Sequence, residues 1–323
     1  MKEKLNQSNE QLIGVLSAAG AYLLWGVLPV YWKQLAHVPA YEILAHRIIW
    51  SCIFMFAILT ATRSLRSFIN ETIDIARNPK KRFGLLIASL LISVNWLIYI
   101  WAVNENRVVE TSLGYYINPL VNVLLGIIVL KEGLSLWQSV SFGLAAVGVG
   151  AMAISYGTIP WVSLSLAMSF SFYGMCKKIL GIGAITATTL ETLIVTPVAL
   201  LYLLYLAGQG GGAFNLTSLP TAGLLMGAGV VTAIPLLLFA NGANRLSLSL
   251  LGFIQYMSPT IALALGVLLY HEPFTSVHLV AFSLIWLALA VFSLAKTNLF
   301  VRAEERLVSL FKGQQARGKK ASS

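Results

Sequence analysis

Acidic residues, cysteine and charge of either sign are scarce in this sequence. Of 323 residues, 11% are charged and twelve are acidic, with Asp74 as the single aspartate. Chemistry that needs clustered aspartates, such as metal or diphosphate binding, therefore has almost no residues to work with. The two cysteines, Cys52 and Cys176, both lie in apolar runs and give no disulfide framework. We expect no catalytic residue, metal or cofactor.

Apolar residues take the place of the missing charges. The chain is 58% hydrophobic, whereas a soluble globular chain is normally about a quarter charged and under half apolar. This composition predicts an all-α polytopic membrane protein whose main partner is the lipid bilayer. The net charge of +10 does not indicate nucleic-acid binding, because the basic residues are scattered between apolar segments instead of covering one face.

The charge-free runs count the membrane spans, since a bilayer core of about 30 Å needs roughly 20 apolar residues per helix. Two runs have double length and break at the turn-like residues 156–160 and 208–212. The sequence therefore predicts ten transmembrane helices, at about 13–33, 43–62, 83–103, 112–130, 136–156, 160–176, 189–207, 220–240, 247–270 and 276–296.

The distribution of basic residues predicts the orientation. With both termini in the cytoplasm, nineteen of the 22 lysines and arginines fall on the cytoplasmic side, as the positive-inside rule requires. Residues 64–77 and 299–311 carry apolar stripes beside basic residues, so we expect both to lie on the membrane surface. After Gly313 the composition is that of a disordered tail.

An internal repeat divides the chain into two halves. Pro119 and Pro259, Gly126 and Gly266, and Glu132 and Glu272 all keep a spacing of 140 residues. Five is an odd number of helices, so two five-helix repeats enter the membrane from opposite sides, an arrangement typical of transporters. The predicted domains are a cytoplasmic N-terminus (1–12), two inverted five-helix repeats (13–156 and 160–296), and an amphipathic and disordered cytoplasmic tail (297–323).

Several segments also carry a family resemblance: Glu42-Ile-Leu-Ala-His-Arg-Ile-Ile-Trp50, Asn95-Trp96, Ser112-Leu-Gly-Tyr-Tyr-Ile-Asn-Pro-Leu-Val-Asn122 and Gly252-Phe-Ile-Gln-Tyr256. This text resembles the RarD group of EamA transporters, in the drug/metabolite transporter superfamily, over nearly the whole chain. The resemblance implies a ten-helix permease of the bacterial inner (plasma) membrane, often linked to chloramphenicol sensitivity. In the loop after Asn104, the text Glu105-Asn106-Arg107 departs from the histidine-containing text expected of the group.

Arg47 is the one cation clearly inside a predicted span, where an ionised side chain costs about 2.5–3.5 kcal/mol. We hypothesise that Arg47 attracts an anionic or carboxylate-bearing solute, while His46 and Glu42 handle protons. The alternative is a structural Arg–Glu clamp or a side chain that reaches the interface.

Predicted helices 112–130 and 247–270 share one feature, an internal proline with polar residues beside it. Pro119 and Pro259 each free a carbonyl and bend the helix in the membrane, so we interpret both as hinges. Polar side chains lie beside them and are candidates for solute binding: Tyr115, Asn118, Asn122, Gln255 and Ser258. The alternative is that these amides hold packed helices together.

The other candidates lie in four further helices. Asn95 and Tyr99 in 83–103 are candidates for solute contacts, with a bond between packed helices as the alternative. Trp25 and Tyr173, at repeat-equivalent positions, are also candidates, with plain packing as the alternative. Glu191, near the cytoplasmic start of 189–207, is a candidate coupling acid or else an interfacial carboxylate.

The sequence thus predicts a secondary transporter that exports small amphipathic metabolites or drugs by alternating access, as a monomer or homodimer. Two other classes stay open at this point, an intramembrane lipid-modifying enzyme and a non-transporting receptor. The first would need a catalytic dyad at one depth, and the second would usually carry a large extramembrane domain.

Overall fold

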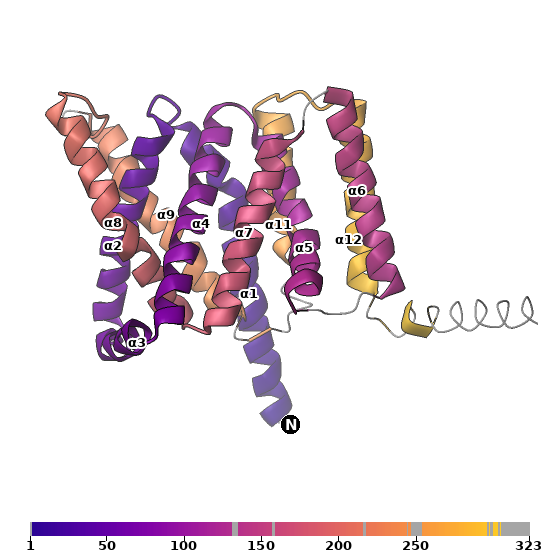
Figure 1. The fold of residues 1–323 in the computed structure, drawn as a ribbon, viewed down its shortest axis with the longest axis horizontal. Helices are drawn as coiled ribbons and strands as arrows, with labels where there is room; N and C mark the ends of the chain where they lie inside the picture. Colours follow the sequence, from indigo (N-terminus) through magenta and orange to yellow (C-terminus); the bar gives the residue numbers. More distant parts are fainter. Residues whose placement is uncertain are drawn as a thin grey trace, which may run out of the picture. The chain divides into compact units, whose positions relative to one another are not determined.

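The protein is helical throughout the part that the structure describes. A computed structural model describes residues 2–130, 135–156, 159–215, 218–243, 245–246, 254–295, 297, 300–302 and 304. Within these ranges every regular element is a helix (Figure 1), which confirms the all-α class.

The helices belong to two compact units. Unit 1 comprises Met1–Asn122 and Trp161–Pro273, and unit 2 comprises Val123–Pro160 and Phe274–Ser323. The helices of unit 1 are α1 (Lys2–Lys33), α2 (Ala40–Ala61), α3 (Leu65–Arg77), α4 (Pro79–Asn104), the first part of α5 (Val108–Leu130), α7 (Trp161–Leu180), α8 (Ala184–Gly208), α9 (Leu219–Ala243), α11 (Met257–Ala264) and the π-helix η1 (Leu265–Leu269). Unit 2 holds the end of α5, α6 (Leu136–Tyr156) and α12 (Ser276–Leu294).

Each of the ten predicted ranges overlaps a helix, and several helices begin a turn or more before the predicted residue. Counting charge-free runs places a helix start too late, because a helix continues through good helix formers such as Lys, Glu and Gln. Six described helices are long and apolar enough to cross a membrane, so the chain is a multi-pass membrane protein: Glu10–Lys33, Ala40–Ala61, Pro79–Asn104, Ile185–Gly208, Leu219–Phe239 and Ser276–Leu294. The count of ten spans stays a prediction.

Helix α4 begins at an N-cap residue, Asn78, followed by a proline. The Asn78 side chain accepts hydrogen bonds from the backbone N–H of Lys80 at 3.0 Å and of Lys81 at 3.2 Å, and Pro79 occupies the first helical position. This cap satisfies two of the free donors of the first turn. It therefore starts α4 directly after the short surface helix α3.

Helix α3 is amphipathic, as residues 64–77 predict. Phe68 and Ile75 are buried, whereas Ile69 and Ile73 are exposed on the outer side of the helix. The Glu71 carboxylate accepts a hydrogen bond at 2.8 Å from the backbone N–H of Gly183, just before α8 begins. The helix is thus fixed to the start of α8.

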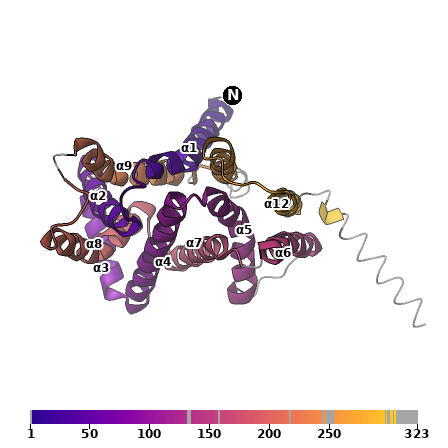
Figure 2. The same cartoon turned by 90° about the horizontal axis from the view of Figure 1, so that it is seen from above.

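The packing of unit 1 brings distant segments together. Helices α1, α2 and α9 are neighbours, as are α2 and α8, and α4 lies beside α7 (Figure 2). Two glycines, one on α5 and one on η1, allow close approaches around α5. A Cβ added at Gly114 would lie 2.8 Å from the Ser163 carbonyl oxygen, and one at Gly266 would lie 3.1 Å from Cγ2 of Val109. Helix α5 is therefore held tightly between α7 and η1.

The π-helix η1 changes the register of the chain after α11. The Tyr270 N–H donates to the Leu265 carbonyl at 3.0 Å, a wider ring than in an α-helix, and the Glu272 N–H donates to Gly266 at 2.9 Å. A π-turn contains one extra residue and so rotates everything that follows it. The chain leaves η1 through His271, which has a left-handed φ of 51°, and so reaches Glu272.

In unit 2, α6 and α12 pack against each other. Trp137 Nε1 donates to the Phe300 carbonyl at 3.0 Å, and the Leu136 N–H donates to Glu304 at 2.8 Å. These contacts join the start of α6 to the segment after α12. Most of the predicted surface segment 299–311, and all of the tail after Gly313, lie outside the described residues.

Candidate functional site

A cavity of about 350 Å³ lies inside unit 1. Helices α1, α2, α4, α5, α7, α8, α9 and α11 all contribute to its wall, which is largely aromatic and aliphatic. Ten predicted site residues line it: Trp25, Arg47, Asn95, Tyr99, Tyr115, Tyr173, Glu191, Gln255, Ser258 and Pro259. The volume suits one small solute.

Arg47 contributes a buried guanidinium to this cavity. Its side chain is 4% exposed, and its Cζ lies 4.2 Å from the ring centre of Trp96 and 5.1 Å from that of Trp32. Among the described residues, Nε and Nη1 have no hydrogen-bond partner. The aromatic rings compensate only part of the desolvation of a buried guanidinium. A guanidinium in a cavity wall can donate charge-assisted hydrogen bonds to an anionic solute.

A second polar group in the wall joins α7 to α8. Lys177 Nζ donates to the Tyr173 hydroxyl at 2.7 Å, and that hydroxyl donates to Glu191 Oε2 at 2.9 Å. Lys177 Nζ also lies 3.4 Å from Glu191 Oε1, which makes an ion pair without a hydrogen bond. Glu191 is 3% exposed. The cavity thus contains a buried carboxylate whose ion-pair partner also lies in the wall.

Two predicted asparagines bond to α7. Asn95 donates to the Leu166 carbonyl at 3.1 Å and to Ser169 Oγ at 2.9 Å, although it also lines the cavity. Asn118 donates to Ala167 and to Ser171 in the same way and is not among the lining residues. Both amides therefore hold helices together, the alternative weighed for them.

Glu42 and His46 lie outside the cavity wall. The Glu42 carboxylate accepts a hydrogen bond from the Ala213 N–H at 2.5 Å, and the His46 ring stacks on Phe214 at 5.0 Å. Neither contact involves Arg47, so Glu42 holds the connection between α8 and α9 instead of clamping the arginine. Pro119 and Asn122 lie in α5, but their side chains are outside the described part of the structure.

The sequence analysis missed Lys177. It was assigned to the cytoplasmic set of basic residues that fixes the orientation. Its spacing of four from Tyr173 puts both side chains on one face of α7. That spacing is the available signal for the Lys177–Tyr173–Glu191 cluster.

Comparisons with known proteins identify the family. The EamA-like transporter family model matches the chain twice, over residues 12–154 and 158–294. An uncharacterized transporter of Bacillus subtilis, YojE, is 48% identical over 301 residues, which cover 90% of this chain and 97% of that protein. Protein RarD of Escherichia coli is 42% identical, over 86% of this chain and 93% of its own length.

More distant matches agree with this result. The chloramphenicol-sensitive protein RarD of Pseudomonas aeruginosa is 28% identical over 85% of this chain and 91% of its own length. A solved crystal structure has the same fold, with a TM-score of 0.57 at 18% sequence identity over 86% of this chain and 96% of that one. The resemblance to the RarD group is thereby confirmed, and the chain is a membrane transporter that belongs to the EamA-like transporter family.

Proposed function

We propose that this protein is a secondary transporter that exports small amphipathic metabolites or drugs across the bacterial inner membrane by alternating access. The chain would work as a monomer or homodimer, with both termini in the cytoplasm, as the basic residues favour. Its small-molecule substrate would lie in the cavity of unit 1. Pro259, in the wall, and Pro119, in the equivalent helix, would act as hinges.

The observation that carries the proposal is the guanidinium of Arg47, which is buried in the cavity wall and whose Nε and Nη1 have no partner among the described residues. Trp32 and Trp96 lie near the guanidinium and limit its movement, while two of its nitrogens have no described partner. A carboxylate of the solute can accept a charge-assisted hydrogen bond from the guanidinium. The surrounding Tyr99, Tyr115 and Trp25 provide apolar and π surface for the body of the solute.

For coupling to protons, Glu191 is the acid that the geometry favours. It is buried in the wall of the same cavity, whereas Glu42 and His46 contact the segment 213–214 instead. Buried acids at membrane depth are costly and are typical of proton pathways. We therefore narrow the predicted coupling set to Glu191, with Lys177 as its ion-pair partner.

Solute flux in proteoliposomes tests the proposal. Two radiolabelled probes of similar size are compared, phenylacetate with a carboxylate and chloramphenicol without one. We expect saturable phenylacetate flux, and Arg47→Gln should raise its KM at least about tenfold, because hydrogen bonds to charged groups contribute about 1.5–3 kcal/mol. The chloramphenicol KM should change much less.

Arg107 offers a matched control. It too lies near two tryptophan rings, with Cζ 5.5 Å from those of Trp101 and Trp161, but it pairs with Glu110 at 2.7 Å and does not line the cavity. Arg107→Gln should leave the phenylacetate KM unchanged. Absence of flux for both probes would count against transport of this class, and equal effects of both arginine variants would remove Arg47 from the site.

A further inference from the structure

The cavity of unit 1 reaches toward one end of the helices only. Its wall includes Lys177, Ile182 and Ile185, which lie around the connection between α7 and α8. Among the described residues, none of the connections at the opposite end (34–39, 105–107, 209–215 and 270–273) contributes to the wall. That opposite end is therefore closed above the cavity.

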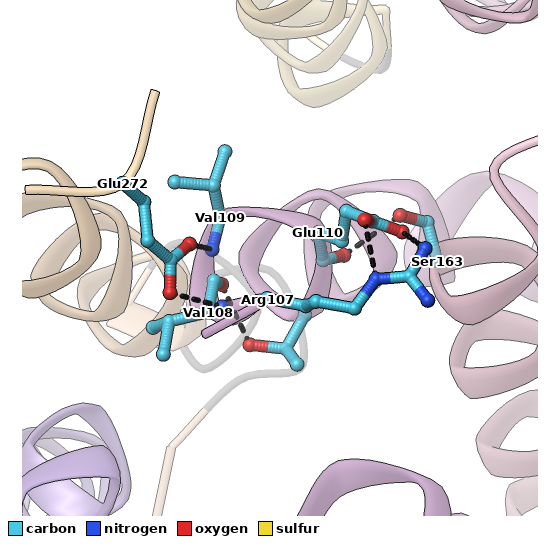
Figure 3. Close-up of polar contacts among 7 residues, drawn as sticks. Arg107, Val108, Val109, Glu110, Ser163 and Glu272 are labelled. Atoms are coloured by element: carbon cyan, nitrogen blue, oxygen red, sulfur yellow. Dashed lines mark hydrogen bonds and ion pairs between the residues drawn. The ribbon is translucent and has the colours of Figure 1, made fainter. Parts of the chain in front are cut away.

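At the closed end, Glu272 is bonded to the start of α5. Its two carboxylate oxygens accept hydrogen bonds from the backbone N–H of Val108 at 2.7 Å and of Val109 at 2.8 Å, as Figure 3 shows. The side chain is 7% exposed. These donors are the first two of α5, which have no partner within the helix and carry the positive end of its dipole. We call this contact of Glu272, Val108 and Val109 the latch.

The latch belongs to a wider contact around the start of α5. On the far side of the helix, Ser163 Oγ of α7 donates to the Glu110 carbonyl at 2.7 Å, and Glu110 pairs with Arg107 (Figure 3). One turn further along, Ser112 Oγ donates to the Pro259 carbonyl at 2.6 Å. The first turn of α5 thus bridges α7 and the α11–η1 segment.

We propose that Glu272 holds the closed end of the cavity shut, and that opening this end requires its carboxylate to leave the start of α5. The inference rests on the proposed alternating access, because only a two-state transporter must open both ends. Since each N–H bond to the carboxylate is charge-assisted, the latch biases the equilibrium toward the conformation seen here. A carboxylate joined to backbone donors gives this bias without any contact to the solute.

Thiol labelling of the full chain tests the latch. The reporter is Leu28→Cys, a buried position in the cavity wall, in a protein whose Cys52 and Cys176 are replaced by serine. A membrane-impermeant maleimide is applied to spheroplasts and, separately, to inside-out vesicles. With Glu272 intact, labelling should be fast from one face and slow from the other. Glu272→Gln should speed labelling from the slow face at least about tenfold.

Glu105→Gln is the matched control. It removes the same charge from the connection between α4 and α5, where Glu105 is exposed and is not part of the latch. Its labelling rates should equal those of the parent. An equal increase in both variants, or an unchanged slow-face rate in folded Glu272→Gln protein, would overturn the proposal.

A second pair of variants keeps the carboxylate. Val108→Pro removes one donor at the first position of α5, where proline is tolerated, whereas Val108→Thr keeps both the N–H and the side-chain volume. Faster slow-face labelling in the proline variant alone supports the latch, and equal rates contradict it. Labelling needs no transported solute, so a protein without flux for either probe would refute the proposed function and leave this test standing.

Discussion

Glu272 and Glu191 are both buried carboxylates of unit 1, yet they have different partners. Glu272 accepts two backbone N–H groups at 2.7 and 2.8 Å. Glu191 accepts one tyrosine hydroxyl and faces the Lys177 ammonium at 3.4 Å. Backbone donors at a helix start are fixed in place, whereas a lysine and a tyrosine can change rotamer. One carboxylate is therefore suited to holding helices and the other to exchanging partners.

The glycines near the two carboxylates also differ in how closely other atoms approach them. Near Glu272, a Cβ at Gly114 or Gly266 would press on neighbouring atoms at 2.8 or 3.1 Å. Near Lys177, a Cβ at Gly174 would meet nothing within 4 Å. Close backbone contact thus accompanies the latch, whereas Gly174, next to Tyr173 in the chain, lies on an exposed part of α7.

We expect the largest difference between the two regions when a methyl group is added to a glycine in each. Gly114→Ala places a methyl group against the Ser163 backbone, which cannot move without shifting α7, so we expect a loss of about 1–3 kcal/mol in the free energy of unfolding. Gly174→Ala has room for the methyl group and should stay within about 0.5 kcal/mol. Thermal unfolding in detergent measures both, and equal losses would show that the two ends are packed alike.

Removal of the lysine should have a smaller effect. Lys177→Ala leaves Glu191 buried without its ion-pair partner, and we expect a loss of about 1–2 kcal/mol, below the range for fully buried pairs because the Lys177 side chain is 26% exposed. Adding Glu191→Gln removes the unpaired charge and should restore part of the stability. A double-mutant cycle on unfolding measures the coupling, and strictly additive losses would contradict the pairing.

The tyrosine hydroxyl should matter least. Tyr173→Phe keeps the ring in the wall but removes the group that bridges Lys177 and Glu191, so the expected loss is about 0.5–1.5 kcal/mol. Tyr22→Phe is the control, since Tyr22 lines the same cavity but its hydroxyl has no hydrogen bond to the described residues. Differential scanning fluorimetry compares the two variants, and an equal change in melting temperature would argue against the bridge.

Helix positions were predictable because the bilayer imposes a length on each apolar run. The residue types that are costly in a membrane were predictable too, and Arg47 and Glu191 both lie in the cavity wall. The partners of these residues were not predictable. An Arg47–Glu42 clamp was the alternative that the sequence left open, whereas the Glu42 carboxylate contacts Ala213, 171 residues away. Partners so distant depend on tertiary packing, which helical periodicity alone does not specify.

Lys177 and Glu272 show two further limits. The positive-inside pattern already explains why a lysine stands at position 177. No further feature of the sequence therefore pointed to the contact of Lys177 with Glu191. Glu272 was found through the repeat, but its partners on α5 lie 163 and 164 residues away. Their contact lies just after a π-helix, whose position no sequence rule gives.

The position of Glu272 depends on the number of residues in the π-helix η1 before it. An α-helix advances about 100° per residue, and η1 contains one residue more than an α-helical turn of the same span. Deleting one residue within Leu265–Leu269 would keep the acid but change its position relative to Val108 and Val109. A member of the EamA-like family could align a glutamate with Glu272 and yet be one residue shorter in the segment aligned with Leu265–Leu269. Such a relative would have the same acid but would not hold the start of α5 in the same way.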